Sequence, residues 1–186
     1  MALLGVFKTL KMREGYVLRA YVFRAQSGGN GVIWAMPEDF KFPEPNACNE
    51  KVEGFIDYPK PPGAQDDLMV AVEGDGSPWS YLQASLFGRE AFEFGAWWHG
   101  CSWSNEEIIE ADLGLDSREW KWRGQRPTTW EPMVEIAKRS VRVRFFTYNR
   151  LIRESIIRHE DTFNVGRYSF KAKTVTIATG PGGTIS

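Results

Sequence analysis

An alternating run at residues 141–148, Val-Arg-Val-Arg-Phe-Phe-Thr-Tyr, is the pattern that most restricts how this chain can fold. Successive side chains of a β-strand point to opposite faces of a sheet. The odd-numbered residues are valine, valine, phenylalanine and threonine, and the even-numbered residues are Arg142, Arg144, Phe146 and Tyr148. The run therefore predicts a strand whose two faces differ in chemistry.

The even-numbered face of this strand predicts a binding surface for an anionic partner. Guanidinium groups for phosphates and ring faces for bases are what a platform for single-stranded nucleic acid needs. Arg167 and Lys171 extend the surface from a closing hairpin predicted at residues 167–177. The competing interpretation is that this face is only solvated, or that its arginines pair with acidic residues elsewhere. The known RNA-binding strand motif is absent from the sequence.

Charge is divided between two parts of the chain, although the net formal value is −1. Residues 1–116 carry 9 Lys and Arg against 18 Asp and Glu, and residues 117–186 carry 14 against 6. This division indicates an anionic partner for the basic part, or a second copy docked acidic face on basic face. The alternative is that the two parts interleave in one fold and neutralise each other, because sequence halves need not be spatial halves.

Length and composition set the fold class. A domain of 186 residues buries about 70% of the surface that its unfolded chain exposes, and a 42% apolar content is that of a globular chain. We find no internal repeat and no interior linker. We expect one α+β domain over residues 1–178, with a mostly antiparallel sheet, three or four short helices, and a flexible tail at residues 179–186.

Strand signals are clearest in the first third of the chain. Alternation at residues 16–24, a Gly-rich turn at 27–31 and an apolar return at 32–36 predict a hairpin. Residues 37–66 contain six of the ten prolines and predict an extended loop. The compact apolar run at residues 68–72 predicts a buried strand.

Capping signals predict the helices. Ser77 followed by Pro78 is typical of a helix start, and Gly88 can close that helix. Three further helices are predicted from similar local signals. A capping box opens a short helix over residues 104–109, Thr129 caps a helix over 130–139, and Asn149 caps a helix with Ile152, Ile156 and Phe163 on one stripe that ends at Gly166.

Residues 97–103, Trp-Trp-His-Gly-Cys-Ser-Trp, form an aromatic cluster with the closest grouping of potentially reactive side chains in the sequence. We prefer a strand for residues 92–98, although a continued helix also fits. In a strand, one face carries Glu93, Trp97, His99, Cys101 and Trp103. These residues could form a nucleophile–base pair or two metal ligands. We favour the plain interpretation of a core histidine beside a buried thiol.

Two further motifs resemble known sites in part. The spacing of Asp112, Glu119 and Lys121 resembles that of metal-dependent nucleases, but a solvated charged loop is the better interpretation. The turn at residues 73–78 has the outline of a dinucleotide-binding loop, but tryptophan stands where the fingerprint needs its third glycine. Phosphate-loop, serine-elbow and zinc-protease motifs are absent, so we expect no cofactor and no metal.

The number of cysteines and the hydropathy of the sequence indicate the compartment in which we expect the protein. Cys48 and Cys101 are too few for a disulfide framework, so we expect free thiols. The apolar start stops after Phe7 with no basic residue before it, unlike a signal peptide. No stretch approaches the roughly 20 apolar residues of a membrane span. We therefore expect a cytoplasmic protein that is not bound to a membrane.

Three hypotheses about function remain. The first is a non-catalytic binding module whose arginine- and ring-bearing sheet face engages nucleic acid or an acidic protein surface, with Trp97 and His99 as further binding residues. The alternative is a small hydrolase with its site around His99, Cys101 and Glu93, or around Asp112 and Glu119. The third is a self-associating structural protein that forms a homo-oligomer.

Overall fold

The structure, a computed structural model of the whole chain, describes residues 3–25, 28–41, 60–94, 103–111 and 119–183. Its contacts separate two compact units. The N-terminal unit holds Met1–Cys101 together with Gly166–Ser169, and the C-terminal unit holds Ser102–Val165 and Phe170–Ser186. The expectation of one domain over residues 1–178 stays a prediction.

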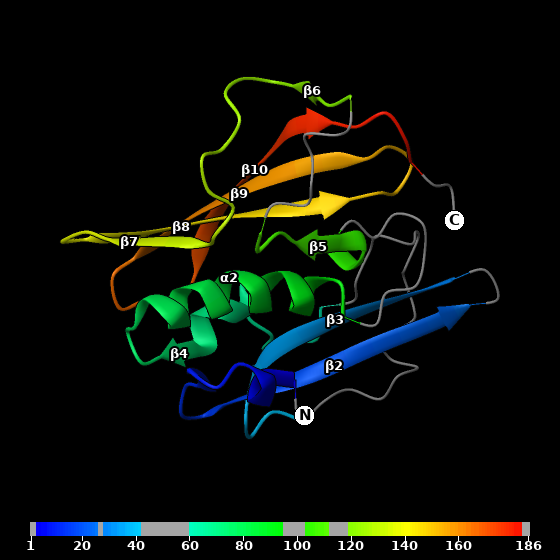
Figure 1. The fold of residues 1–186 in the computed structure, drawn as a ribbon. Helices are drawn as coiled ribbons and strands as arrows, with labels where there is room; N and C mark the ends of the chain where they lie inside the picture. Colours follow the sequence, from blue (N-terminus) through cyan, green and yellow to red (C-terminus); the bar gives the residue numbers. More distant parts are fainter. Residues whose placement is uncertain (1–2, 26–27, 42–59, 95–102, 112–118, 184–186) are drawn as a thin grey trace. The chain divides into compact units, whose positions relative to one another are not determined.

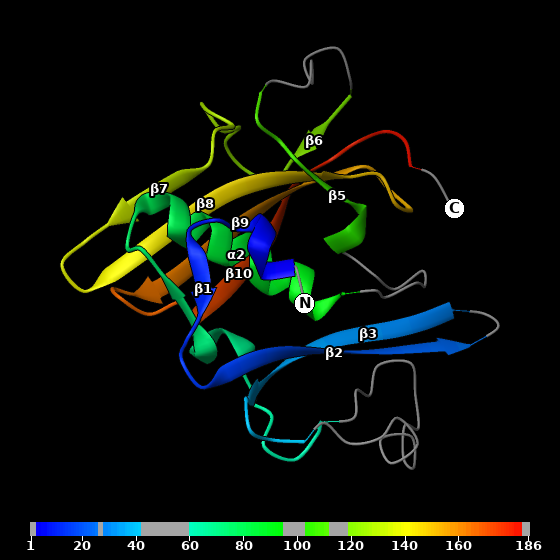
Figure 2. The same cartoon turned by 90° about the horizontal axis from the view of Figure 1, so that it is seen from below.

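A long hairpin forms one part of the N-terminal unit. Strands β2 (Tyr16–Ala25) and β3 (Gly28–Pro37) pair antiparallel over their full length, as a two-stranded ribbon (Figures 1 and 2). This hairpin was predicted, and it is confirmed. Strand β3 supplies buried apolar side chains to this unit, including Ile33, Ala35 and Met36.

The run at residues 68–72 was wrongly predicted to be a single buried strand. It forms a 3-10 turn, η2 (Leu68–Ala71), whose first N–H groups are capped by the Asp67 carboxylate, which accepts from the backbone N–H of Met69 at 2.8 Å. Strand β4 (Val72–Gly74) follows and pairs antiparallel with β1 (Leu10–Met12). Met69, Ala71 and Val72 are buried as predicted, but Val70 is exposed, and the Asp67 cap favours a turn where apolar content alone suggests a strand. A short 3-10 turn, η1 (Leu3–Val6), precedes β1.

Helix α2 (Pro78–Phe92) begins where the capping residues predict. The Ser77 hydroxyl accepts from the backbone N–H of Ser80 at 3.2 Å, and Pro78 occupies the first turn. The Asp75 carboxylate accepts hydrogen bonds from Ser77, and these lower the pKa of Asp75 below its usual value. The Ser77 hydroxyl has the larger effect, and the Ser77 backbone N–H has the second. The helix continues through Gly88 to Phe92, so the predicted end at Gly88 is wrong. No described helix is long and apolar enough to cross a membrane.

Tyr168, in the four-residue loop that returns to the N-terminal unit, packs directly on the start of this helix. Its hydroxyl accepts from the backbone N–H of Gly76 at 2.9 Å and lies 2.8 Å from the Ser80 hydroxyl. Its ring stacks on the Tyr81 ring with centroids 5.0 Å apart. A Cβ built on Gly74 would lie 2.4 Å from the Tyr168 ring, so this approach requires glycine.

We expect Gly74→Ala to lower the free energy of unfolding by about 1–3 kcal/mol, because the added methyl must displace a ring held by two hydrogen bonds and a stack. Gly5→Ala is the matched control, since a Cβ there meets nothing within 4 Å. Urea unfolding of both variants measures the difference. Equal stability of the two variants would show that Tyr168 moves aside at little cost.

The C-terminal unit is an antiparallel sheet. After the 3-10 turn η3 (Trp103–Asn105), its strands are β5 (Glu106–Ile108), β6 (Lys121–Trp122), β7 (Met133–Ile136), β8 (Ser140–Asn149), β9 (Ser155–Asn164) and β10 (Phe170–Thr179). The strand order is β5-β8-β9-β10-β6, and β7 also pairs with β8. The long strands β8, β9 and β10 run side by side in Figure 1.

The expected fold class, with three or four short helices, is wrong. Strands make up 44% of the described residues, and α2 is the one described helix of seven residues or more. The predicted helices at residues 104–109 and 130–139, and the one from Asn149 to Gly166, contain strands β5, β7 and β9 instead. The strand predicted at residues 141–148 is confirmed as β8.

Strand β9 shows why the helix signals failed. All ten of its residues pair with β8 on one side, and all but Asn164 pair with β10 on the other, so the backbone groups find partners in both directions. A stripe of apolar residues at helical spacing is a local signal, whereas the partners of this strand are the preceding and following strands, each across a turn. Paired β-branched residues such as Ile156 and Ile157 suit this strand, with each facing a different side.

One face of this sheet is a buried core. Val141, Val143, Phe145 and Thr147 are all fully buried, as the alternation along β8 indicates. The neighbouring strand adds His159, whose ring stacks on Phe145 with centroids 4.6 Å apart. The His159 Nε2 atom lies 2.9 Å from both the Glu106 carboxylate and the Thr147 hydroxyl. This polar trio is thus enclosed within apolar surroundings.

Candidate anion-binding pocket

The opposite face of the sheet carries rows of charge across its strands. Cross-strand pairing aligns Glu135, Arg142, Thr162 and Lys171 in one row. The next row aligns Arg144, Glu160 and Lys173 with Met133 at its end, and the row after it contains Phe146, Arg158 and Val175. We call this surface the charged face. It is predominantly basic, as the even-numbered residues of β8 indicate.

Tryptophans cover part of this face. Trp130 packs edge-on against Phe146 with ring centroids 5.2 Å apart, and Trp120 packs against Tyr148 at 6.2 Å. These residues form a core with neighbouring apolar side chains, and Phe146 is only 4% exposed. The two rings expected to meet nucleic-acid bases therefore stabilise the fold from within.

A pocket of about 470 Å³ lies where the covered and uncovered parts of the charged face meet. The loop at residues 125–131 forms one wall, and the sheet forms the other. The lining side chains are Gln125, Arg126, Pro127, Thr128, Thr129, Glu131, Met133, Arg144, Phe146, Arg158 and Ile177. Three arginines thus surround a cavity that has an apolar part and several neutral hydrogen-bonding groups.

Acidic and aromatic neighbours hold the three guanidinium groups. The Arg144 Nε atom donates to Glu160 Oε1 at 3.2 Å, and the Arg158 Nε atom lies 3.5 Å from the same oxygen. The Arg126 guanidinium carbon lies 5.6 Å from the centre of the Trp122 ring, a cation–π distance. Guanidinium groups are suited to carboxylates and phosphates, because their planar N–H forks match these anions.

No family model, curated protein or solved structure matches this chain. The chemistry of the site is therefore argued from its own residues. A pocket of this size is in the range that binds small ligands or one group of a larger partner.

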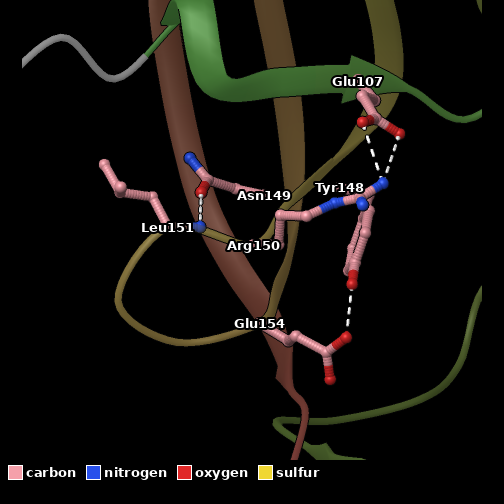
Figure 3. Close-up of polar contacts among 6 residues, drawn as sticks. All are labelled: Glu107, Tyr148, Asn149, Arg150, Leu151 and Glu154. Carbon is pink, nitrogen blue, oxygen red and sulfur yellow. Dashed lines mark hydrogen bonds and ion pairs between the residues drawn. The ribbon is translucent and has the colours of Figure 1, made fainter. Parts of the chain in front are cut away.

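Tyr148, also predicted as a binding residue, lies at the other end of the charged face (Figure 3). Its hydroxyl donates to Glu154, and the Arg150 guanidinium carbon lies 5.5 Å from the centre of its ring. Arg150 in turn donates to both oxygens of Glu107, at 3.0 and 3.3 Å. The figure shows these side chains linked around the turn after β8, where Asn149 caps the backbone N–H of Leu151 at 2.7 Å.

The other predicted binding residues lie in different places. Arg142 is exposed beside the pocket and pairs with Glu135 at 3.6 Å, and Lys171 is exposed in the same row. Arg167 belongs to the loop that groups with the N-terminal unit, so it is not placed on this face. Trp97 and His99 lie outside the described residues.

The residues of the hydrolase hypothesis are only partly described. Glu93 is the C-cap of helix α2 and not part of a strand, which corrects that expectation where the structure describes it. Glu119 is exposed, while Cys48, Cys101 and Asp112 fall outside the described residues. Within the described part of the chain, no three His, Cys, Asp or Glu side chains are arranged to hold a metal ion.

The sequence analysis missed Arg126 and Arg158, which line the pocket, and Glu160, which contacts Arg144 and Arg158. Arg158 and Glu160 were assigned to a helix, which separated them from Arg144. The alternation Ile-Arg-Glu-Thr at residues 156, 158, 160 and 162 is the signal that could have placed them on a strand face. Arg126 gives no such signal, because a loop residue has no periodic pattern.

Proposed function

We propose that the C-terminal unit is a non-catalytic binding module that takes an anionic group of its partner into the arginine pocket. The observation that supports this proposal is the convergence of Arg126, Arg144 and Arg158 on one cavity of about 470 Å³. A phosphodiester of nucleic acid and a carboxylate of an acidic protein surface both supply such a group.

The mode of binding differs from the ring platform expected from the sequence. Phe146 and Tyr148 are buried, so the proposed interaction depends on guanidinium groups and not on base stacking on these two rings. Exposed Arg142, Lys171 and Lys173 lie in the adjoining rows and add positive charge around the pocket. A basic surface of this kind raises the local concentration and association rate of an anionic partner.

We expect Arg158→Gln to weaken anion binding about tenfold at low salt, because one charge-assisted contact is worth about 1.4 kcal/mol or more. The probes are a short single-stranded oligonucleotide and an acidic peptide, each titrated calorimetrically from low to physiological salt. For the oligonucleotide, the salt slope should fall by about one.

Arg153→Gln is the matched control, because it removes the same charge from an exposed residue of the turn before β9 that does not line the pocket. Melting temperatures of both variants report whether the fold survives. The proposal fails if wild type binds neither probe at low salt, or if both variants lose affinity equally.

A further inference from the structure

Strand β10 is an edge of the C-terminal sheet along most of its length. It pairs with β9 on one side, from Phe170 to Thr179. On the other side, β6 pairs only with Ala178 and Thr179, at the end of the strand (Figure 1). Within the residues that the structure describes, no strand pairs with the outer side of residues 171–176. Such an edge presents backbone N–H and C=O groups to any strand that can approach it.

The exposure of β10 is that of an edge strand. Four consecutive residues, 171–174, are exposed, so both faces of the strand are open there. In the neighbouring strand β9, no two consecutive residues are exposed. Residues 171–176 extend over roughly 20 Å at about 3.3 Å per residue, which is the length of an ordinary strand. There is thus room for one more strand beside β10.

The two faces of this edge carry different side chains. Lys171 and Lys173 lie on the charged face, and Ala172 and Thr174 lie on the opposite face, because successive residues of a strand alternate. The edge therefore combines positive charge at every second position with small side chains between the charges.

The acidic residue in register with these lysines does not neutralise them. Glu160 is the β9 partner of Lys173, but its carboxylate contacts Arg144 and Arg158. The β9 partner of Lys171 is a neutral threonine. Among the described residues, neither lysine forms an ion pair. Both charges are thus available to a partner that carries carboxylates.

We infer that an extended acidic peptide of a partner protein adds to β10 as a further strand, antiparallel like the described pairings of this sheet. Its backbone pairs with residues 171–176, and its carboxylates, at every second position, lie beside Lys171 and Lys173. The residues between them lie beside Ala172 and Thr174. Residues 171–176 do not line the arginine pocket, so this surface goes beyond the proposed function.

The lysines favour this occupant over a second copy of the chain. Lysines on an edge strand are a common protection against pairing between identical strands. Two copies of β10 paired antiparallel about Ala172 would place Lys171 of one opposite Lys173 of the other, and like charges directly opposite each other are destabilising. Carboxylates at those positions replace the repulsion by attraction. A nucleic acid supplies negative charge but no ladder of peptide N–H and C=O groups.

The test is an NMR titration of the isotope-labelled full chain, with assigned backbone resonances, by three peptides. The first, acetyl-Thr-Val-Glu-Val-Glu-Val-Thr-amide, alternates glutamate with valine. The second has glutamine in place of both glutamates. The third is the first with N-methyl groups on the central valine and on the glutamate that follows it. Since consecutive N–H groups of a strand point to opposite sides, one of the two methyl groups faces β10 in any register.

We expect the first peptide to shift the resonances of residues 171–176 and to bind with a single saturable affinity. The glutamine peptide should bind about three- to tenfold more weakly, because it lacks two cross-strand charge pairs. The N-methylated peptide has the same charge as the first, but it should not bind measurably at β10, because it lacks a backbone donor and carries a methyl group in its place.

We expect Lys173→Gln to weaken binding of the glutamate peptide about threefold and to leave binding of the glutamine peptide unchanged, because it removes one charge pair. Lys138→Gln is the matched control, since it removes the same charge from an exposed residue of the turn between β7 and β8. Its affinity for the glutamate peptide should equal that of wild type.

The outcomes separate this inference from the proposed function. If the N-methylated peptide binds as tightly as the first, or if the resonances of the loop at residues 125–131 shift in place of those of β10, the peptide binds by charge alone. Strand addition is then overturned, while the arginine pocket stands. If β10 responds to the first peptide as expected but no anionic probe reaches the pocket, the proposed function fails and strand addition stands.

The other possible occupants give their own results. β10 resonances that shift with protein concentration alone would assign the edge to a second copy of the chain. Equal shifts at β10 with a short oligothymidylate would make the edge a general basic surface. Equal binding of the glutamine and glutamate peptides would remove the acidic specificity. Each of these three results overturns the inference.

Discussion

Replacing Glu106 by alanine is expected to lower the free energy of unfolding by about 3 kcal/mol, whereas the same change at Glu107 should cost less than about 1 kcal/mol. The two side chains are neighbours in β5, but the Glu106 side chain is 6% exposed and that of Glu107 is 65% exposed. Glu106 accepts from the Thr147 hydroxyl at 2.5 Å and lies 2.9 Å from His159 Nε2. Its removal leaves two buried polar groups without their acceptor.

Urea unfolding of both variants measures this contrast. Glu106→Gln should fall between wild type and alanine, because an amide oxygen can accept one of the two hydrogen bonds. His159 Nδ1 is also buried without a hydrogen-bond partner, so losing the contact at Nε2 would leave both ring nitrogens without a partner other than Thr147. If Glu106→Ala lowered the free energy of unfolding no more than Glu107→Ala does, water would have to enter the cluster or the core would have to repack.

Phe145→Ala should lower the free energy of unfolding by about 3–5 kcal/mol, the largest effect that we expect from a single substitution. The ring is fully buried at the centre of β8. It stacks on the His159 ring, and Trp103 contacts both rings edge-on, with centroids 6.3 Å from Phe145 and 5.9 Å from His159. Alanine would leave a cavity beneath the polar trio and remove the stacking partner of its histidine.

Phe145→Leu is the informative companion, because leucine fills most of the volume without a ring face. Its loss of unfolding free energy should be clearly smaller than that of alanine, at about 1–2 kcal/mol. Thermal and urea unfolding, with near-ultraviolet circular dichroism for the tryptophan environment, provide the measurements. Alanine and leucine variants of equal stability would show that packing volume at this position matters little.

The elements that could be predicted from the sequence are those whose two faces carry clearly different residue types. Strand β8 has buried residues on one side and arginines on the other, so its alternation is visible without knowledge of its partners. The same holds for the hairpin of β2 and β3. Ser77 and Pro78 predict the start of α2 because capping is satisfied within four residues.

The failures share a physical cause. Thr129, Ser104 and Asn149 are local capping residues, and each is followed by a segment whose backbone pairs with β8. After Thr129 and Asn149 the pairing crosses a short turn, and after Ser104 it joins segments far apart in the sequence. Glu107, which would close the predicted capping box, instead accepts from Arg150, while its neighbour Glu106 reaches Thr147 and His159. Pairing between strands outweighs a local cap worth about 1 kcal/mol.

The candidate site was predictable only in part. Arg142 and Arg144 were placed on the correct face, because strand geometry determines it. The burial of Phe146 was not predictable, since it depends on Trp130, which arrives from a loop without periodic pattern. The pocket depends on the same loop, so its arginines come together only through the tertiary fold.

The return of Gly166–Ser169 to the N-terminal unit has a consequence for synthesis on the ribosome. Tyr168 completes the packing at Gly74 and Tyr81, but it is translated after most of the C-terminal unit. At about 5–20 residues per second, the delay after residue 101 is on the order of several seconds. The nascent N-terminal unit therefore stays incomplete during this interval, and chaperones that bind exposed apolar surface have time to engage it before the last ring arrives.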